Sequence, residues 1–314
     1  MRVVVGRLAQ GVIVLLIVSA ITFFMINLAP GGPSALMRFD VTPEQREALT
    51  RRFGLDQPVP VRYLQWLANA VRGDLGTSLT TQQPVVDRIA ERLPNTLLLS
   101  GLALTLSIVV GIPMGVASAL RRGTATDYSL SALSLLGLSI PAFWFGIMLI
   151  LTFSVTLQVL PSSGVATTGA DFSLTDRLQH LIMPTIVLST AALPTVVRFT
   201  RSAMLEVLGQ DFIRTAAAKG LSRPAVTYGH GLRNALVPVV SVIGALVPRL
   251  VGGAVVTEAV FGWPGMGRLA VEAANGRDYP LVVGITVVIA AIVILSSLLV
   301  DLAYTWIDPR IRLT

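Results

Sequence analysis

The sequence predicts an all-α integral membrane protein with six transmembrane helices and both termini in the cytoplasm. Of its 314 residues, 53% are hydrophobic and only 13% are charged, whereas a soluble domain carries roughly a quarter charged residues. The charges are clustered, and the uncharged runs between the clusters are long enough for membrane-spanning helices of about 20 residues. Basic residues also concentrate in alternate loops, which sets an orientation.

The uncharged runs give the expected spans in order. They lie at about 8–28, between Arg92 and Arg121, at about 129–157, between Arg177 and Arg198, at about 236–257 and at 279–300. Pro248 and Arg249 interrupt the fifth run. Arg2 and Arg7 precede the first run, so a cleaved signal peptide is an alternative. The run is long for a signal peptide and no clear cleavage site follows it, which favours a retained helix. Pro184 and Pro194 lie inside the fourth run, where kinks are tolerated because neighbouring helices re-satisfy the backbone.

The charge distribution divides the chain into four segments. We expect a first transmembrane helix (1–29), an extracytoplasmic segment (30–94), a five-helix core (95–303) that includes a cytoplasmic loop (198–235), and a cytoplasmic tail (304–314). With the N-terminus inside, cytoplasmic segments hold twelve Arg and Lys residues and the short outer loops hold three. This asymmetry predicts an N-in, C-in topology.

Several chemistries are excluded by composition. The chain has no cysteine, and its single lysine, Lys219, is followed by Gly220, so it cannot form the GxxxxGK[ST] loop that binds ATP. His180 and His230 are the only histidines, too few for a histidine-rich metal cage. The net charge of +7 reflects cytoplasmic loops rather than a nucleic-acid-binding face.

Few ionisable residues fall inside the expected spans. Arg249 lies well inside the fifth span, while Glu258 and Asp301 lie near span ends. Ion-coupled carriers and intramembrane enzymes usually place acids or catalytic pairs within the membrane. An ion-coupled secondary transporter is therefore the weaker alternative, and a membrane enzyme is weaker still.

The loop 198–235 contains two predicted short helices. Asp211 can cap the first, and Gly220 can end it in the left-handed conformation. Ser222 can cap the second, with Pro224 in its first turn. Phe212, Thr215, Ala216 and Lys219 recur at three- and four-residue spacing and would share one face. The residues alone leave open whether this face docks on another protein or packs against the base of its own bundle.

Several sequence blocks in this order resemble one family. DFIRTAAAKGLS (211–222) and HGLRNALVPVV (230–240) resemble the EAA motif of binding-protein-dependent ABC importer permeases, in the form found in the dipeptide/oligopeptide group. Further blocks from the same group are GDLGTS (73–78), PVVDRIAERLPNTLLLS (84–100), EAVFGWPGMGRL (258–269), RDYPLVVG (277–284) and VDLAYTWIDPRIR (300–312).

The match is not complete at two places. The general motif begins Glu-Ala-Ala, where this chain has Arg214, Thr215 and Ala216. In the fifth span, Pro248 and Arg249 stand where the family usually has small uncharged residues.

The resemblance implies a transport subunit of the bacterial plasma (inner) membrane without its own ATPase site, cofactor or metal. Its partners would be a second, similar permease, two ATPase subunits and an extracytoplasmic binding protein that delivers di- or oligopeptides, with membrane lipid around the helices. Nickel complexes, glutathione or haem are alternative substrates for the same machine. The implied ATPase-coupling residues are Asp211, Phe212, Thr215, Ala216, Ala217, Lys219 and Gly220. Independently of the resemblance, we expect Arg249 to face the pathway or the partner permease rather than lipid, because a charge at that depth is costly unless it is paired or hydrated. Glu258 is the second candidate pathway residue.

The segment 30–94 is the only sizeable part expected outside the cell membrane. Its mixed charges suit a wet, transient interface, so we expect it to help dock the binding protein through Arg46, Arg51 and Arg52. The alternative is a lid over the pathway mouth that touches only the partner permease.

Overall fold

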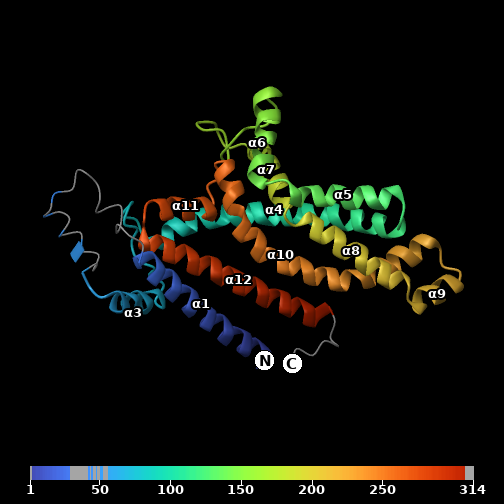
Figure 1. Cartoon of the computed structure of the whole chain (residues 1–314), viewed down its shortest axis with the longest axis horizontal. Helices are drawn as coiled ribbons and strands as arrows, with labels where there is room; N and C mark the ends of the chain where they lie inside the picture. The colour runs from blue at the N-terminus through green and yellow to red at the C-terminus, as the bar shows by residue number, and fades with distance from the viewer. Residues whose placement is uncertain are drawn as a thin grey trace. The chain divides into compact units, whose positions relative to one another are not determined.

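The chain is mainly helical in the residues that its computed structural model describes, namely 2–28, 42, 44, 47, 50–51 and 56–307 (Figure 1). Parts of the predicted segment 30–94, including Arg46 and Arg52, and most of the predicted tail 304–314 lie outside these residues. Apart from helices and turns, the described part contains one isolated antiparallel bridge between Thr77 and Pro84.

The helices of the described part begin with α1 and end with α12. In chain order they are α1 (Arg2–Leu28), α3 (Val59–Ala70), α4 (Val85–Leu120), α5 (Ala125–Ser139), α6 (Ala142–Leu149), η2 (Ile150–Thr156), α7 (Leu174–Ser189), α8 (Leu193–Leu208), α9 (Asp211–Ala218), η3 (Ala225–Leu232), α10 (Arg233–Val260), α11 (Met266–Asn275) and α12 (Tyr279–Ile307). The two η elements are π-helices.

Four helical stretches are long and apolar enough to cross a membrane: Gly6–Leu28, Val85–Leu120, Ala225–Val260 and Tyr279–Val300. Two bent helix pairs, α5 with α6–η2 and α7 with α8, raise the number to six if each pair is one span. The structure thus confirms a helical membrane protein with long apolar helices, and the six-span N-in, C-in topology stays a prediction.

The bent pairs break where proline restricts the backbone. The segment 129–157 was expected as one span, but it bends by 99° between Ser139 and Ala142. Ile140 is extended (φ −92°, ψ 125°), because a residue that precedes a proline, here Pro141, is disfavoured in the helical conformation. The bend of 55° between α7 and α8 falls just before Leu193–Pro194, whereas Pro184 lies inside the continuous helix α7.

Two compact units divide the chain. The first comprises 1–96 and 264–295, and the second 97–263 and 296–314. In the first unit, α4, α11 and α12 bury a common core, with the residues Val85, Ile89, Met266, Leu269, Ala273, Leu281 and Ile285. Helix α11 was missed in the sequence, where its residues were expected to form an outer loop.

A buried carboxylate ties two loops of the first unit together. Asp278, fully buried, directly precedes α12 and accepts hydrogen bonds from the hydroxyls of Ser78 (2.5 Å) and Thr80 (2.8 Å). It also accepts from the backbone N–H groups of Leu79 (3.1 Å), Thr80 (3.2 Å) and Leu281 (3.4 Å). The loop after Gly76 is therefore fixed to the start of α12 by one side chain.

In the second unit, glycines let α4 and α8 approach closely. A Cβ at Gly111 would lie 2.8 Å from Val196, and one at Gly115 would lie 2.7 Å from the carbonyl oxygen of Val197. The spacing Gly111-x-x-x-Gly115 is the small-residue pattern that brings membrane helices into backbone contact. Such contact replaces the hydrophobic driving force that helices lack in lipid.

Candidate functional site

The short helix α9 lies in the connection between α8 and α10, where the sequence predicted a docking element. Asp211 was expected to cap this helix, but it is the first helical residue, and the capping position is taken by Gln210 in an extended conformation (φ −82°, ψ 153°). The Asp211 carboxylate instead lies 3.4 Å from the Arg214 guanidinium on the exposed surface. An acid in the first turn still favours the helix through the macrodipole.

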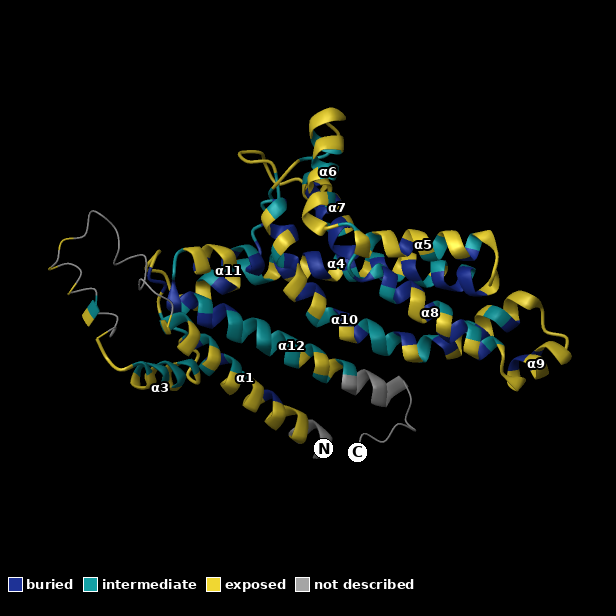
Figure 2. Cartoon of the chain, viewed as in Figure 1, coloured by how far each residue is buried: buried dark blue, intermediate teal, exposed yellow. Residues whose placement is uncertain are grey.

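Helix α9 has one buried and one exposed face (Figure 2). Ile213 and Ala216 are each only 7% exposed and belong to a core cluster with residues of α4, α8, η3 and α10. Phe212, Thr215 and Lys219 are exposed, with Phe212 at 39%. Both alternatives from the sequence therefore hold in part, because α9 packs on its own bundle through one face and presents the other.

The predicted position of Ala216 on the docking face is wrong. Spacing placed it on one docking face with Phe212, Thr215 and Lys219, yet its side chain is buried against this chain's own helices. Ala217, which follows it, is exposed. The reason is that residues 213 and 216 share the face that meets η3 and α8, and the sequence does not reveal which side these elements occupy.

Gly220 ends α9 as expected. Its φ is +82°, the left-handed conformation in which glycine has no steric cost, and its N–H donates to the carbonyl of Ala217 (3.0 Å). Helical residues resume at Arg223, directly after Ser222, with Pro224 in the first turn, and continue through η3 into α10. The turn at Gly220 thus links α9 to a long helix.

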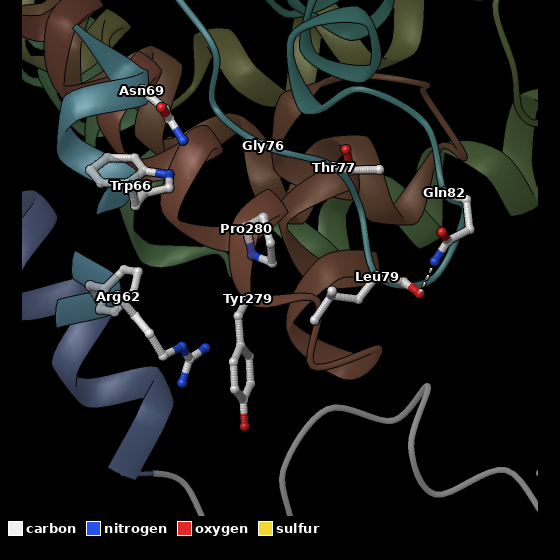
Figure 3. Close-up of a pocket in the computed structure, with 10 residues that line it drawn as sticks. Arg62, Trp66, Asn69, Gly76, Thr77, Leu79, Gln82, Tyr279 and Pro280 are labelled. Carbon is white, nitrogen blue, oxygen red and sulfur yellow. Dashed lines mark hydrogen bonds between the residues drawn. The ribbon is translucent and has the colours of Figure 1, made fainter. Parts of the chain in front are cut away.

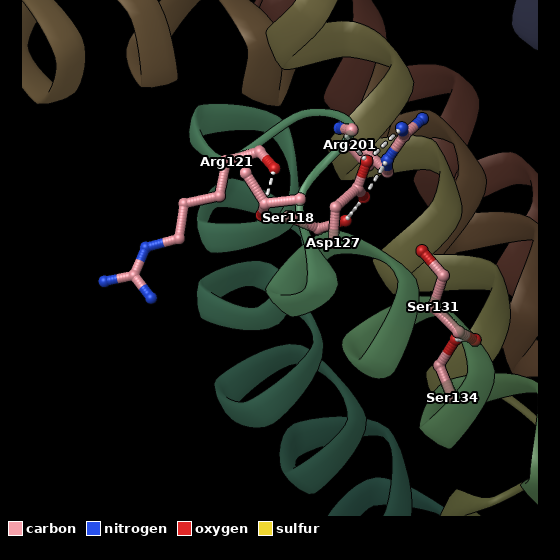
Figure 4. Close-up of polar contacts among 8 residues, drawn as sticks. Ser118, Arg121, Asp127, Ser131, Ser134 and Arg201 are labelled. Carbon is pink, nitrogen blue, oxygen red and sulfur yellow. Dashed lines mark hydrogen bonds and ion pairs between the residues drawn. The ribbon is translucent and has the colours of Figure 1, made fainter.

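An ion pair between a buried carboxylate and a partly exposed arginine fixes the region of α8 that leads into α9 (Figure 4). Asp127, at the start of α5, accepts two parallel hydrogen bonds from Arg201 of α8, from Nε and Nη2, each at 2.8 Å. The hydroxyl of Ser118 and the N–H of Gly123 (3.0 Å) also donate to this carboxylate. One carboxylate therefore holds the end of α4, the α4–α5 turn and α8 together.

An open groove lies beside η3 in the same unit. It has a volume of about 420 Å³ and is lined mainly by apolar residues of α4, together with Arg121 and with Tyr228 and Leu232 of η3. Tyr228 is 55% exposed. The two groove residues of η3 follow the turn at Gly220 in sequence, and the exposed residues of α9 precede it.

The two predicted pathway residues do not form one site. Arg249 is exposed and Glu258 is fully buried, and both belong to α10. Nine residues at 100° per residue place them on opposite faces of the helix. Arg249 remains a candidate for the pathway or for a partner permease, because a charge at that depth needs a partner or water.

Sequence reasoning missed the two buried carboxylate centres. Asp127 and Asp278 were visible as acids at the ends of uncharged runs, which is a weak signal of a buried role. Their partners, Arg201 and Ser78, lie 74 and 200 residues away, and nothing in a single sequence pairs them. Arg201 had been counted only as a cytoplasmic charge.

Comparison with known proteins agrees with these features. A family model described as "Binding-protein-dependent transport system inner membrane component" matches residues 111–313, and the model of the corresponding N-terminal region matches residues 1–100. The chain is 43% identical over 311 residues to the oligopeptide transport system permease protein AppB of Bacillus subtilis, covering 98% of both chains. It is 41% identical over 318 residues to the dipeptide transport system permease protein DppB of Escherichia coli, covering 94% of both.

Solved structures show the same fold. The MetNI methionine ABC transporter, in inward-facing conformations, contains a chain that matches with a TM-score of 0.58 at 20% identity, covering 70% of this chain and 96% of that one. Together with the family models and the named relatives, the long apolar helices place this chain among the membrane permeases of ABC transporters. The chain belongs to the family of binding-protein-dependent transport system inner membrane components. It is a multi-pass protein of the bacterial plasma membrane.

Proposed function

We propose that this chain is one permease subunit of an ATP-driven peptide importer and forms half of the translocation pathway. Its relatives at 41–45% identity are named for oligopeptide, dipeptide or peptide transport and match nearly the whole chain. The second half of the pathway is a similar permease, two ATPase subunits supply the energy, and an extracytoplasmic protein delivers the peptide.

The observation that carries this proposal is the two-sided packing of α9. Ile213 and Ala216 anchor the helix in its own bundle, while Phe212, Thr215 and Lys219 point outward. A helix held in this way transmits a push from a bound ATPase subunit into η3 and α10, because α9 contacts η3 and η3 continues into α10. Phe212 is the main anchor for the ATPase, since aromatic residues often dominate interface energies.

Two phenylalanines of nearly equal exposure allow a matched test. Phe212 on α9 is 39% exposed and Phe199 on α8 is 40% exposed. Phe212→Ala should weaken binding of the ATPase subunits by 2 kcal/mol or more, about 30-fold, and abolish ATP hydrolysis stimulated by the peptide-loaded binding protein. Phe199→Ala should leave ATPase binding unchanged. Equal ATPase binding by both variants and the unchanged protein would assign the coupling role to another segment.

Orientation is tested in the same assay system. The chain lacks cysteine, so a single Thr215→Cys variant can be labelled with a membrane-impermeant maleimide. We expect labelling in inside-out vesicles and none in sealed cells. Labelling from outside the cell would show that the topology is opposite to the proposed one.

Substrate class depends on the binding protein that delivers it. Nickel complexes, glutathione and haem remain alternatives to peptides, and the ligand bound by the partner binding protein decides among them. An ion-coupled carrier would instead transport without ATPase subunits. Transport by this chain and its partner permease alone, driven by an ion gradient, would favour that second class.

Arg249 is proposed to face the partner permease or the pathway. Arg249→Ala distinguishes the two, because loss of a pairing role impairs assembly, whereas loss of a substrate contact leaves assembly intact and slows transport.

Docking of the binding protein on 30–94 is likewise a proposal. Within the described part of that segment, Arg51 is exposed and paired with Glu47 at 2.6 Å, and its charge reversal, with those of Arg46 and Arg52, should weaken capture of the binding protein.

A further inference from the structure

Helix α3 carries a stripe of exposed apolar side chains. Val61, Leu64 and Val71 are 42%, 64% and 81% exposed, and with Ala68 they recur at i, i+3, i+7 and i+10 along one face. The opposite face packs on α1, where Tyr63 and Trp66 make ring contacts with Phe23 at 5.5 and 6.3 Å between centroids. An amphipathic helix of this kind beside a transmembrane helix buries its outer face in an apolar medium.

A pocket of about 370 Å³ opens beside the polar edge of α3 (Figure 3). Arg62 is the one lining residue with a formal charge at neutral pH, and Asn69, Gln82 and Tyr279 contribute polar groups. The Arg62 guanidinium donates to the amide oxygen of Asn27 at 2.8 Å and lies 5.8 Å from the Phe23 ring centroid. Among the residues that the structure describes, no carboxylate lies within ion-pair distance of Arg62.

The pocket lies where two membrane-spanning helices end. Phe23 belongs to the candidate span Gly6–Leu28, and Tyr279 and Pro280 begin the candidate span Tyr279–Val300. The two helices are neighbours, because a Cβ at Gly11 of α1 would lie 2.7 Å from Ile294 of α12. Tyr and Trp side chains gather at this level of membrane proteins, where the headgroups begin.

We propose that α3 lies along the outer lipid–water boundary and that its pocket binds the phosphate of a phospholipid headgroup through Arg62. The apolar stripe then faces acyl chains, and the guanidinium receives the anionic oxygen atoms that its surroundings lack. Arginine suits this role because its fork of N–H groups matches a phosphate. Burial lowers the pKa of Arg62 from its ordinary value, yet a guanidinium keeps its proton at neutral pH.

A lipid explains both features better than a peptide carboxylate does. A peptide would occupy the pocket only during transport and would leave Leu64 and Val71 in water. A bilayer covers the stripe at all times and presents phosphate at the same level. The proposal concerns this chain's own setting in the membrane and does not depend on which substrate is transported.

The first experiment measures lipid affinity. The assembled transporter is placed in phosphatidylcholine nanodiscs, and phosphatidylglycerol binding is titrated by native mass spectrometry. Arg62→Gln should weaken that binding about tenfold, the effect of one charge-assisted hydrogen bond. Arg62→Lys, which keeps the charge but loses the fork of N–H groups, should give an intermediate affinity. Arg72→Gln is the control, because Arg72 is an exposed arginine just past the end of α3 and does not line the pocket.

The second experiment locates α3. A bimane probe on Leu64→Cys should be quenched by lipids with a nitroxide near the headgroup and be protected from aqueous iodide. Quenching by iodide alone, or protection from both quenchers, would overturn the boundary position. Unchanged lipid affinity in Arg62→Gln would overturn the phosphate site. If that variant instead requires more peptide-loaded binding protein for half-maximal ATP hydrolysis, the pocket serves the substrate and the lipid proposal is wrong.

Discussion

Replacing Asp278 with Asn tests how the first unit holds its loop. The two side chains have the same shape, so no cavity forms. The carboxylate, however, accepts five hydrogen bonds: one oxygen receives the hydroxyls of Ser78 and Thr80 and the N–H of Thr80, and the other receives the N–H groups of Leu79 and Leu281. An amide has only one oxygen, so its –NH₂ group must replace one of these two acceptors.

Either orientation of the amide leaves a backbone donor without an acceptor. With –NH₂ toward Thr80, that residue's N–H faces another donor; with –NH₂ toward Leu79, the N–H groups of Leu79 and Leu281 do. A stranded buried donor costs about 1–3 kcal/mol, and the remaining bonds lose the strength that a charged acceptor gives. We therefore expect Asp278→Asn to reduce the free energy of unfolding by about 2–4 kcal/mol. Asp74→Asn is the control, because exposed Asp74 accepts a single bond, from Gly76 N–H at 2.8 Å, and should change stability by about 1 kcal/mol or less.

Two measurements check this estimate. The unfolding temperature of the purified transporter should fall by about 4–8 °C in Asp278→Asn, at about 2 °C per kcal/mol for a chain of this size. Leu79 is only 4% exposed, so maleimide labelling of a Leu79→Cys variant reports local opening of the loop. Labelling should be about 30-fold faster or more when Asp278→Asn is added. Unchanged unfolding temperature and labelling rate would refute the view that this carboxylate holds the loop.

Three further substitutions follow from local geometry. Gly220→Val should insert normally but lose coupled transport, because a β-branched residue at φ +82° costs roughly 1–2 kcal/mol; Gly220→Asn, which tolerates that conformation, should restore much of the ATPase stimulation. Ala217→Trp should block ATPase binding with unchanged unfolding temperature, because Ala217 is exposed. Ala216→Trp should lower the unfolding temperature, because Ala216 is buried. The reverse result would show that the buried and exposed faces of α9 have been assigned wrongly. Gly115→Val should destabilise the chain by about 1–3 kcal/mol, because its Cβ meets a backbone oxygen of α8, while Gly101→Val on the same helix meets nothing within 4 Å and should be neutral in thermal unfolding.

The membrane-spanning regions could be predicted because lipid imposes one strong rule, the absence of charge over about 20 residues. The same rule does not show whether a helix bends within an uncharged run. The bend at Pro141 was visible in principle, since a residue before proline avoids the helical conformation, but the uniform apolarity of 129–157 favoured one straight helix. Whether α5 and α6–η2 form one broken span depends on neighbours that the run itself does not specify.

The face of α9 was predicted only in part. Helical spacing correctly grouped Phe212, Thr215 and Lys219, but it also admitted Ala216, because a small residue fits an interface and a core equally well. Burial of Ala216 depends on contacts with elements that are close to it only in the folded chain. Helix α11 was missed for a related reason: its ten residues are too few and too polar to register as a span, and their buried stripe has meaning only against α12.

The helix is continuous from η3 into α10, so a tilt at the end beside α9 moves the far end of α10. Helical residues run from Ala225 to Val260, and α10 alone has 28 residues, or roughly 42 Å at 1.5 Å per residue. A tilt of about 10° at the end beside α9 would carry the far end sideways by roughly 7 Å. Pro238 and Pro248 lie inside α10, where each removes a backbone hydrogen bond, and the helix can bend at these two points. Under the proposed coupling role of α9, a small movement at the turn of Gly220 would therefore produce a larger displacement at the far end of α10.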